Sequence, residues 1–351
     1  MTAAGAACAG GVQAAAAGGR LVAGGLATYL DAEDGVGGRP RQVRYRVEAS
    51  CTAQGLLAAL VRSKPVVART LEAGALSRGG AVLRRQDALA PGVVVTLALA
   101  PADAPHAGAA SAAGACGREE PHVLYRDPFL MAVDKPAGIL VHGDGTGART
   151  LTDDVAALLA REGVPSAPQA VQRLDVDTTG VVLFSLAPEF QPALDALVAS
   201  HGMRKRYLAV VEGSFPAGVR RMDAPIGRDR HDARRMRVSA GGKPALTLVT
   251  VLARRGGRSL LLLELGTGRR HQIRVHLAHA GHPIVGDALY GRAAGGRSGG
   301  RAAGAGGLML HAVCEELAHP ATGEALRLEA GWPARFGKFF SPLDYDAGAR
   351  C

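Results

Sequence analysis

The sequence predicts an α+β protein in which a mainly antiparallel, mixed sheet with flanking helices follows a small α/β module. From about residue 122 to 340, apolar and often β-branched segments recur with connections of hairpin length, and few segments have helical periodicity. Long stretches of Ala, Gly and Pro divide the chain. We therefore expect a flexible tail (1–42), the small module (43–100), a linker (101–120), the main domain (121–342, with a disordered loop at about 293–307) and a second tail (343–351).

The small module begins with an alternating apolar and basic segment, Val43–Val47, which is typical of a strand. Helical periodicity follows over 56–61 and 66–71, and the segments 81–83 and 93–97 are predicted to pair as strands about a Pro-Gly turn. This order resembles the S4-like RNA-binding module, in which two helices and a small sheet present basic residues to RNA. The resemblance implies RNA contacts by Lys64, Arg69 and Arg78. An ordinary small α/β domain with surface arginines is the alternative.

The main domain is predicted to be rich in strands, with two clear helices. One helix covers Leu151–Arg161, because Thr150 or Thr152 can cap it and two aspartates follow in its first turn. The second covers 190–200 and ends at a glycine. The apolar segments predicted to be strands are 130–133, 181–186, 207–211, 246–252 and 260–265.

Charge and cysteine usage limit the function classes. The net charge is +10, and the segment 203–237 carries ten basic residues against four acidic ones, which favours a polyanionic partner such as nucleic acid. The five cysteines are far apart and form no Cys-x-x-Cys pair, so we expect a reduced, cytoplasmic protein. The N-terminal stretch has too much glycine for a membrane-spanning helix, and no membrane partner is expected.

Three segments carry residues suited to catalysis. Asp175 follows Arg173 by two positions and precedes a Thr-Thr-Gly turn, which leaves a carboxylate at the edge of a loop. Tyr207 begins an apolar strand and needs a polar partner if buried. Farther on, a Gly-rich turn precedes a helix on which Arg270 and Arg274 share a face, so one of them can pair with a buried carboxylate.

Four histidines close together, at 271, 276, 279 and 282, suggest a metal site at first sight. However, there is no His-Glu-x-x-His motif and no acidic ligand nearby, so we predict no metal. A metal hydrolase is therefore a weak alternative. Roles in helix packing or in contacts with RNA suit these histidines better.

Taken together, these segments resemble the RluA-type pseudouridine synthases. The resemblance covers residues from about 120 to 340 and depends on motifs in the same order along the chain. These motifs are Val133-Asp134-Lys135-Pro136-Ala137-Gly138, Arg173-Leu174-Asp175 with Thr178-Thr179-Gly180, Lys205-Arg206-Tyr207-Leu208-Ala209, and Gly268-Arg269-Arg270-His271-Gln272-Ile273-Arg274 running on to Gly286-Asp287.

The resemblance implies the pseudouridine synthase fold and the isomerisation of uridine in RNA without a metal or organic cofactor. It implies that Asp175 is the nucleophile and that Arg173 displaces or holds the target nucleotide. Tyr207 stacks on the flipped uracil or aids proton removal, and Arg274 pairs with the aspartate. Further contacts to RNA are expected from Gln172, Thr178, Lys205, Arg269, His271 and Gln272.

The chain departs from the family pattern in two motifs, since Gln172 stands where the family has histidine and Thr178-Thr179-Gly180 stands where it has Thr-Ser-Gly. A glutamine can still hydrogen-bond to RNA, so we expect activity with an altered choice of target. The expected substrate is large-subunit ribosomal RNA, with transfer RNA as the alternative, and a monomer is expected. A catalytically silent RNA-binding protein that assists ribosome assembly is the alternative function.

Overall fold

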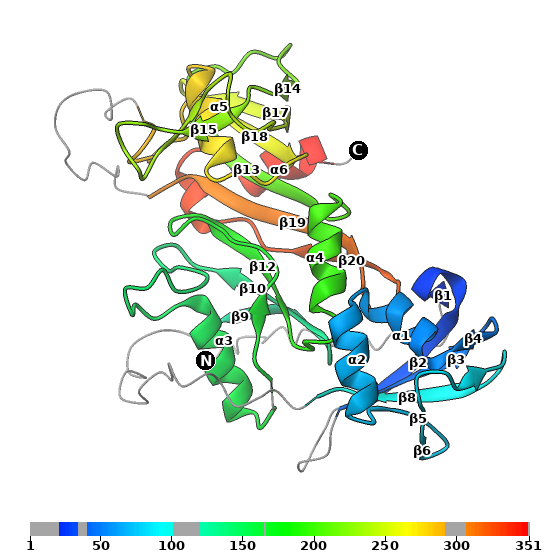
Figure 1. The fold of residues 1–351 in the computed structure, drawn as a ribbon. Coiled ribbons are helices and arrows are strands. Elements are labelled where there is room, and N and C mark those ends of the chain that lie inside the picture. The colour runs from blue at the N-terminus through cyan, green and yellow to red at the C-terminus, as the bar shows by residue number, and fades with distance from the viewer. Residues whose placement is uncertain (1–20, 34–40, 101–119, 165, 292–306, 350–351) are drawn as a thin grey trace, which may run out of the picture.

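The computed structural model describes residues 21–33, 41–100, 120–164, 166–291 and 307–349 (Figure 1). Within these ranges the chain forms one six-stranded sheet, one ten-stranded sheet and two sheets of two strands. All strand pairs are antiparallel except β12 with β19, which confirms the predicted α+β class. The expected linker and the expected loop at 293–307 lie outside the described residues, apart from Glu120 and Gly307.

The six-stranded sheet belongs to the small module and includes part of the expected tail. Its order is β1-β2-β3-β8-β5-β6. The tail prediction was wrong for residues 21–33, because β2 pairs along β3 and Tyr29 packs edge-on against Tyr45. The strands are β1 (Leu21–Val22), β2 (Ala27–Glu33), β3 (Gln42–Val47), β5 (Leu76–Arg78), β6 (Ala81–Val82) and β8 (Val94–Ala98).

The predicted pairing of 81–83 with 93–97 was also wrong. Strand β8 pairs with β3 and β5, and β6 pairs with β5 around the Gly79-Gly80 turn. The helices α1 (Ala53–Val61) and α2 (Lys64–Glu72) are both present, after the short 3-10 turn η1 (Ala23–Gly25). A small ladder of β4 (Cys51–Thr52) with β7 (Ala88–Leu89) lies beside them.

The ten-stranded sheet forms the main domain, in the order β14-β17-β18-β13-β19-β12-β10-β9, with β11 on β12 and β20 on β19. It contains all five predicted strands. The bounds are β9 (His122–Arg126), β10 (Leu130–Lys135), β11 (Gln169–Ala170), β12 (Thr179–Ser185), β13 (Arg204–Glu212), β14 (Arg221–Met222), β17 (Thr247–Arg255), β18 (Arg258–Leu265), β19 (Leu310–Ala318) and β20 (Ala325–Glu329).

Helices cover both faces of β10 and β12. Because side chains alternate along a strand, Met131 and Phe184 share one buried cluster with α3 (Leu151–Arg161), while Leu130 and Leu183 share the other with α4 (Gln191–Ala199). Helix α3 has the predicted bounds. It begins with a capping box. The Thr150 hydroxyl accepts from the Asp153 amide, and the Asp153 carboxylate accepts from the Thr150 amide.

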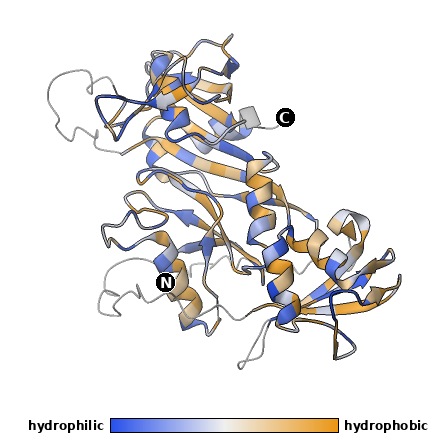
Figure 2. Cartoon of the chain, in the orientation of Figure 1, coloured by the Kyte–Doolittle hydropathy of each residue, from blue (hydrophilic) through white to orange (hydrophobic). Residues whose placement is uncertain are grey.

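The expected second tail is helical over residues 343–349. Helix α6 (Pro342–Ala349) begins where the Asp344 carboxylate accepts hydrogen bonds from the main chain and hydroxyl of Ser341, and Tyr345 packs against the main core. A hairpin of β15 (Ile226–Arg228) and β16 (Met236–Val238) carries a loop that is hydrophilic in Figure 2. The remaining helices are α5 (Gln272–His279) and η4 (Ala334–Lys338).

The small module and the main domain share one hydrophobic core. The ring of Phe129 lies between Tyr29 of the module and Phe190 of the main domain, and α1 lies beside α4 (Figure 1). Arg41, which is 3% exposed, donates to the carbonyls of Pro128 and Leu186. The two parts therefore form one continuous body.

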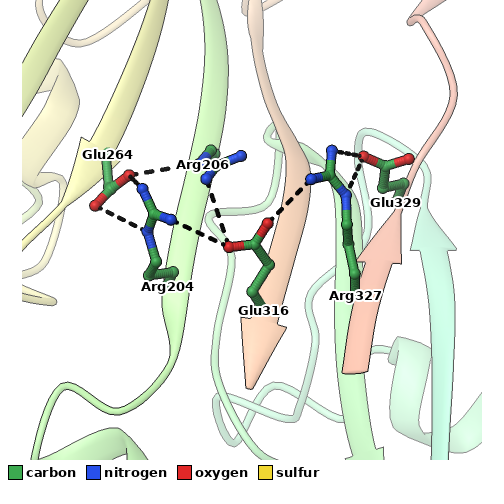
Figure 3. A network of polar contacts seen from close by, with 6 residues as sticks. All are labelled: Arg204, Arg206, Glu264, Glu316, Arg327 and Glu329. Carbon is green, nitrogen blue, oxygen red and sulfur yellow. Dashed lines mark hydrogen bonds and ion pairs between the residues drawn. The ribbon is translucent and has the colours of Figure 1, made fainter. Parts of the chain in front are cut away.

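On the outer face of the large sheet, ion pairs cross four adjacent strands (Figure 3). Each pair is partly exposed, so each contributes little to stability, and the network mainly fixes neighbouring strands in register. Its members are Arg204, Arg206, Glu264, Glu316, Arg327 and Glu329. Among the helices that the structure describes, none is long and apolar enough to cross a membrane.

Candidate active site

A cavity of about 970 Å³ lies where the loop before β12, the start of β13 and the turn before α5 meet. Asp175 in the first segment and Arg274 after the last are 99 residues apart in the chain, and only the fold brings them together. Ten of the predicted site residues line the cavity: Gln172, Arg173, Asp175, Thr178, Lys205, Tyr207, Arg269, His271, Gln272 and Arg274. Lys64, Arg69 and Arg78 are exposed on the small module, outside the cavity.

Asp175 lies in the loop just before β12. The chain reverses at Val176-Asp177, where the Thr178 amide donates to the Asp175 carbonyl at 3.1 Å. The predicted turn at Thr-Thr-Gly is therefore two residues too late, because Thr179 already belongs to the strand. The carboxylate of Asp175 is 26% exposed, so it can meet a substrate in the cavity.

A buried lysine holds the loop after Asp175. Lys135, at the end of β10, is fully buried and its Nζ donates to the carbonyls of Pro136, Val176 and Thr178 at 2.8–2.9 Å. Burial lowers the pKa of Lys135 to about 8, although nearby Asp177 and Asp175 favour the charged form. Three carbonyl acceptors in a fixed arrangement determine the path of the loop.

Close contact between strands requires a glycine at the second residue of β12. Gly180 has a φ of 109°, and a Cβ built there would lie 2.1 Å from the Ala312 carbonyl oxygen on β19. A larger residue would push β12 away from β19 and move the loop that carries Asp175. The glycine of the motif thus has a steric role.

Arg274 joins two carboxylates from the first turn of α5. Its Nη1 donates to Asp175 Oδ2 at 2.9 Å, and Nε and Nη2 donate to Asp287 at 2.8 Å each. Burial alone would lower the pKa of Arg274, but the hydrogen bonds and charges of Asp287 and Asp175 outweigh it and raise the pKa. Arg274 is therefore a permanent cation, oriented by Asp287 and directed at Asp175.

His271 is a second neighbour of Asp175. It adopts a left-handed conformation with φ of 55° before α5, and its Nε2 lies 3.8 Å from Asp175 Oδ1. Its Nδ1 lies 2.8 Å from the Tyr290 hydroxyl. Burial lowers the pKa of His271, and the charge of Asp175 offsets only part of this effect. The imidazole is therefore mainly neutral at neutral pH.

Tyr207 forms a wall of the cavity. Its side chain enters the main core, with 6% of the residue exposed. Burial, and then the charges of Glu315 and Asp175, raise the pKa of the Tyr207 phenol. The side chain is therefore a neutral phenol, which can offer a ring face and a hydrogen bond but not a resident negative charge.

Three predicted RNA contacts are used within the protein instead. Gln172 Nε2 donates to both carboxylate oxygens of Glu315 at 2.7 Å. Gln272 donates to Leu246 and Thr247 and accepts from Thr267. Thr178 is 2% exposed, and its main chain bonds to Asp175 and Lys135. These side chains shape the site, and their expected contacts to RNA stay a prediction.

Arg173, Lys205 and Arg269 are also expected to contact RNA, and each lines the cavity with a side chain that is at least partly exposed. Arg173 is exposed and Lys205 half-buried. Arg269 Nε donates to the Pro244 carbonyl, and its neighbour Arg270 donates to the Arg234 carbonyl at 3.3 Å. This last contact brings the basic loop between β15 and β16 to the rim of the cavity.

Two important residues were missed by the sequence analysis. Asp287 stood in a motif but received no role, and its fully buried side chain proves to orient Arg274. Glu315 was not noticed, although an acid inside the apolar run of β19 is an unusual signal. Of the clustered histidines, His276 bonds to Thr247 and Ala224 and His282 to the Glu212 carbonyl, and no metal-binding group is found among the described residues.

Comparison with known proteins identifies the family. Residues 130–279 match the family described as RNA pseudouridylate synthase. The chain is 38% identical over 215 residues to an uncharacterised RNA pseudouridine synthase, YhcT, of Bacillus subtilis, covering 60% of this chain and 68% of that protein. It is also 38% identical over 236 residues to ribosomal large subunit pseudouridine synthase D of Xanthomonas campestris, covering 64% of this chain and 70% of the relative.

Solved structures agree. Human RNA pseudouridylate synthase domain containing 4 superposes with a TM-score of 0.51 at 26% identity, over 62% of this chain and 90% of the human chain. The human domain-containing 1 protein gives a TM-score of 0.50 at 26% identity, over 61% and 84%. The chain therefore belongs to the RNA pseudouridylate synthase family, as its resemblance to the RluA-type enzymes predicts.

Proposed function

We propose that this enzyme converts uridine to pseudouridine in large-subunit ribosomal RNA, with Asp175 as the nucleophile. The observation that carries the proposal is the position of Asp175. Its carboxylate is open to a large cavity, and Arg274 holds one of its oxygens at 2.9 Å. The guanidinium orients the carboxylate and balances its charge, which leaves the other oxygen directed at substrate.

The reaction detaches uracil from ribose and rejoins it through carbon 5, so the enzyme has to hold a free base. A uridine within a helix must first leave the stack, which costs a few kcal/mol. In our proposal the Tyr207 ring stacks on the flipped base and Arg173, exposed at the cavity, occupies or stabilises the vacated position. Lys205, Arg269 and His271 contact the RNA around the target.

Basic residues give the RNA a path to the cavity. The loop between β15 and β16 and the start of α5 place arginines at its rim, including Arg234 and Arg270. On the small module, Lys64, Arg69 and Arg78 form a second exposed basic group. We propose that both groups neutralise phosphates of one structured RNA.

The choice of substrate follows the relatives. The Xanthomonas protein is named for the large ribosomal subunit, and so is pseudouridine synthase C of Escherichia coli, which is 36% identical over 211 residues. Mapping pseudouridines in cellular RNA with and without this gene tests the proposal. Loss of a site in large-subunit ribosomal RNA supports it, whereas loss only in transfer RNA would contradict the substrate.

The nucleophile is tested separately with purified protein. Asp175→Asn keeps the shape of the side chain, so the folded variant should make no detectable pseudouridine in RNA that wild type modifies. Asp195→Asn, at an exposed position on α4, is the matched control and should behave as wild type. If folded Asp175→Asn retains activity, Asp175 is not the nucleophile. RNA binding without isomerisation by wild type would instead favour a silent RNA-binding protein.

A further inference from the structure

A buried carboxyl group lies beneath the catalytic loop without lining the cavity. Glu315, on β19, has no exposed surface, and both its oxygens accept from Gln172 Nε2 at 2.7 Å. Gln172 does line the cavity and is 8% exposed. The contact joins residues 143 positions apart in the chain, at the point where the loop toward Asp175 begins.

Few other groups compensate for the burial of Glu315. The cation facing it is Lys205, its register partner on β13, and Tyr207 lies on the same strand as an uncharged neighbour. Burial raises the pKa of Glu315 to about 7, and the charge of Lys205 and the Gln172 hydrogen bond reduce this effect only in part. A well-packed apolar residue would cost less, so stability gives no reason for an acid here.

The geometry of the loop gives a reason. Gln172 holds its beginning through Glu315, and Lys135 holds its end through the carbonyls of Val176 and Thr178. Arg173 and Asp175 lie between these two fixed points. The side chain of Arg173 is exposed to the cavity, while Asp175 meets Arg274. A shift at the first fixed point would therefore move both functional side chains together.

We propose that Glu315 is a positioning residue of this enzyme, which acts through Gln172 to hold Arg173 and Asp175 in their productive places. The role rests on the proposed function of Asp175. It also accounts for the glutamine at position 172, because a carboxamide can place two donors on a buried carboxyl group. In this enzyme the position that holds histidine in the family is thus occupied by a glutamine paired with Glu315.

Kinetics test the proposal with a matched pair of variants. Glu315→Leu removes the acceptor, whereas Glu316→Leu changes the next residue, which belongs to the exposed ion-pair network on the outer face (Figure 3). We expect Glu315→Leu to lower kcat by about 10- to 100-fold with little change in KM, since misplacement by a fraction of an ångström affects the chemical step most. Glu316→Leu should keep the wild-type kcat.

Two further variants separate positioning from simple loss of structure. Glu315→Gln keeps an acceptor for Gln172 and should restore most of kcat. Gln172→Leu should lose as much as Glu315→Leu, and the double variant should lose no more than either single one, because both remove the same contact. Wild-type kcat in a folded Glu315→Leu, or a double variant with the product of the two losses, would overturn the proposal.

A measurement without catalysis keeps this proposal distinct from the function itself. Amide hydrogen exchange over residues 172–178 should be faster in Glu315→Leu than in wild type and unchanged in Glu316→Leu. Unchanged exchange in Glu315→Leu would refute the positioning role even if Asp175 is the nucleophile. Faster exchange together with a fully active Asp175→Asn would instead refute the proposed nucleophile and leave the contact established.

Discussion

Arg274 donates to both carboxylate oxygens of Asp287, through Nε and Nη2 at 2.8 Å each. The pair is almost completely buried, since the side chain of Asp287 has no exposed surface and that of Arg274 is 8% exposed. This bidentate contact fixes the plane of the guanidinium, and only Nη1 is left to reach Asp175. Asp287 therefore controls the position of the Asp175 carboxylate through the arginine.

The first prediction concerns this geometry. Arg274→Lys keeps the positive charge but loses the planar fork, so one ammonium group cannot serve Asp287 and Asp175 in the same way. We expect kcat to fall by about 10- to 100-fold and the free energy of unfolding to fall by about 1–3 kcal/mol. Single-turnover assays and urea unfolding measure the two effects. Arg221→Lys, on the exposed β14, should change neither, and an active Arg274→Lys would contradict the prediction.

The second prediction concerns the ring of Tyr207. Burial raises the pKa of the phenol, so the side chain stays protonated at neutral pH and its ring is its main contribution to binding. We expect Tyr207→Ala to weaken binding of target RNA by about 1–3 kcal/mol, and Tyr207→Phe to bind within about a factor of two of wild type. Equilibrium binding to an RNA with a single target uridine checks this. Equal losses in both variants would mean that the hydroxyl, not the ring, binds the base.

The third prediction concerns pH and Glu315. Its folded-state pKa of about 7 lies above the ordinary value of 4.5, so the folded protein binds the proton more tightly than the unfolded chain. The stability that Glu315 contributes is therefore complete below about pH 4.5 and is lost as the pH rises to about 7. Glu315→Gln cannot ionise. The free energy of unfolding of this variant, relative to that of wild type, should therefore increase from pH 5 to pH 8.

The size of this effect has an upper limit of about 3–4 kcal/mol, because the pKa of Glu315 rises from 4.5 to about 7 and each tenfold change in proton affinity corresponds to about 1.4 kcal/mol. Urea unfolding at the two pH values measures it. Glu316→Gln, in the partly exposed network, is the control and should show a much smaller change. A constant difference between Glu315→Gln and wild type at both pH values would show that Glu315 does not titrate in this range.

The fourth prediction concerns the small module. If Lys64, Arg69 and Arg78 neutralise phosphates, replacing all three with Gln should reduce the slope of log affinity against log salt by about 2–3. Filter binding at several salt concentrations gives the slope. Gln at three arginines that are already paired with glutamates, Arg126, Arg161 and Arg327, provides the control. An unchanged slope in the first variant would exclude the module from RNA binding.

Local signals made much of the fold predictable. The helix Leu151–Arg161 has its predicted bounds because its capping box lies within a few residues of its start. Strand β2 was missed because it forms by pairing with β1 and β3, and the abundant Ala and Gly around it suggested a tail. The pairing of β8 with β3 and β5 is likewise set by distant partners rather than by the nearest turn.

The candidate site likewise has residues that local motifs reveal and contacts that only the fold reveals. Asp175, Tyr207 and Arg274 are recognisable because each lies in a motif, and the structure brings all three to one cavity. The contact of Gln172 with Glu315 spans 143 residues, so no local pattern could reveal it. Gln272 looked free for RNA in the sequence, yet its carboxamide is fully used by neighbours that only folding supplies.

The core shared by the small module and the main domain fixes the distance between the two proposed RNA-binding surfaces. In the described part of the chain, Arg41, with its two carbonyl acceptors, and the ring of Phe129 join the module to the main domain. In this structure the basic group of Lys64, Arg69 and Arg78 therefore lies at a fixed distance from Asp175. If an RNA contacts both the module and Asp175, as we propose, its uridine has to lie at one fixed distance from the bound phosphates. The shape of the RNA would then contribute to the choice of target.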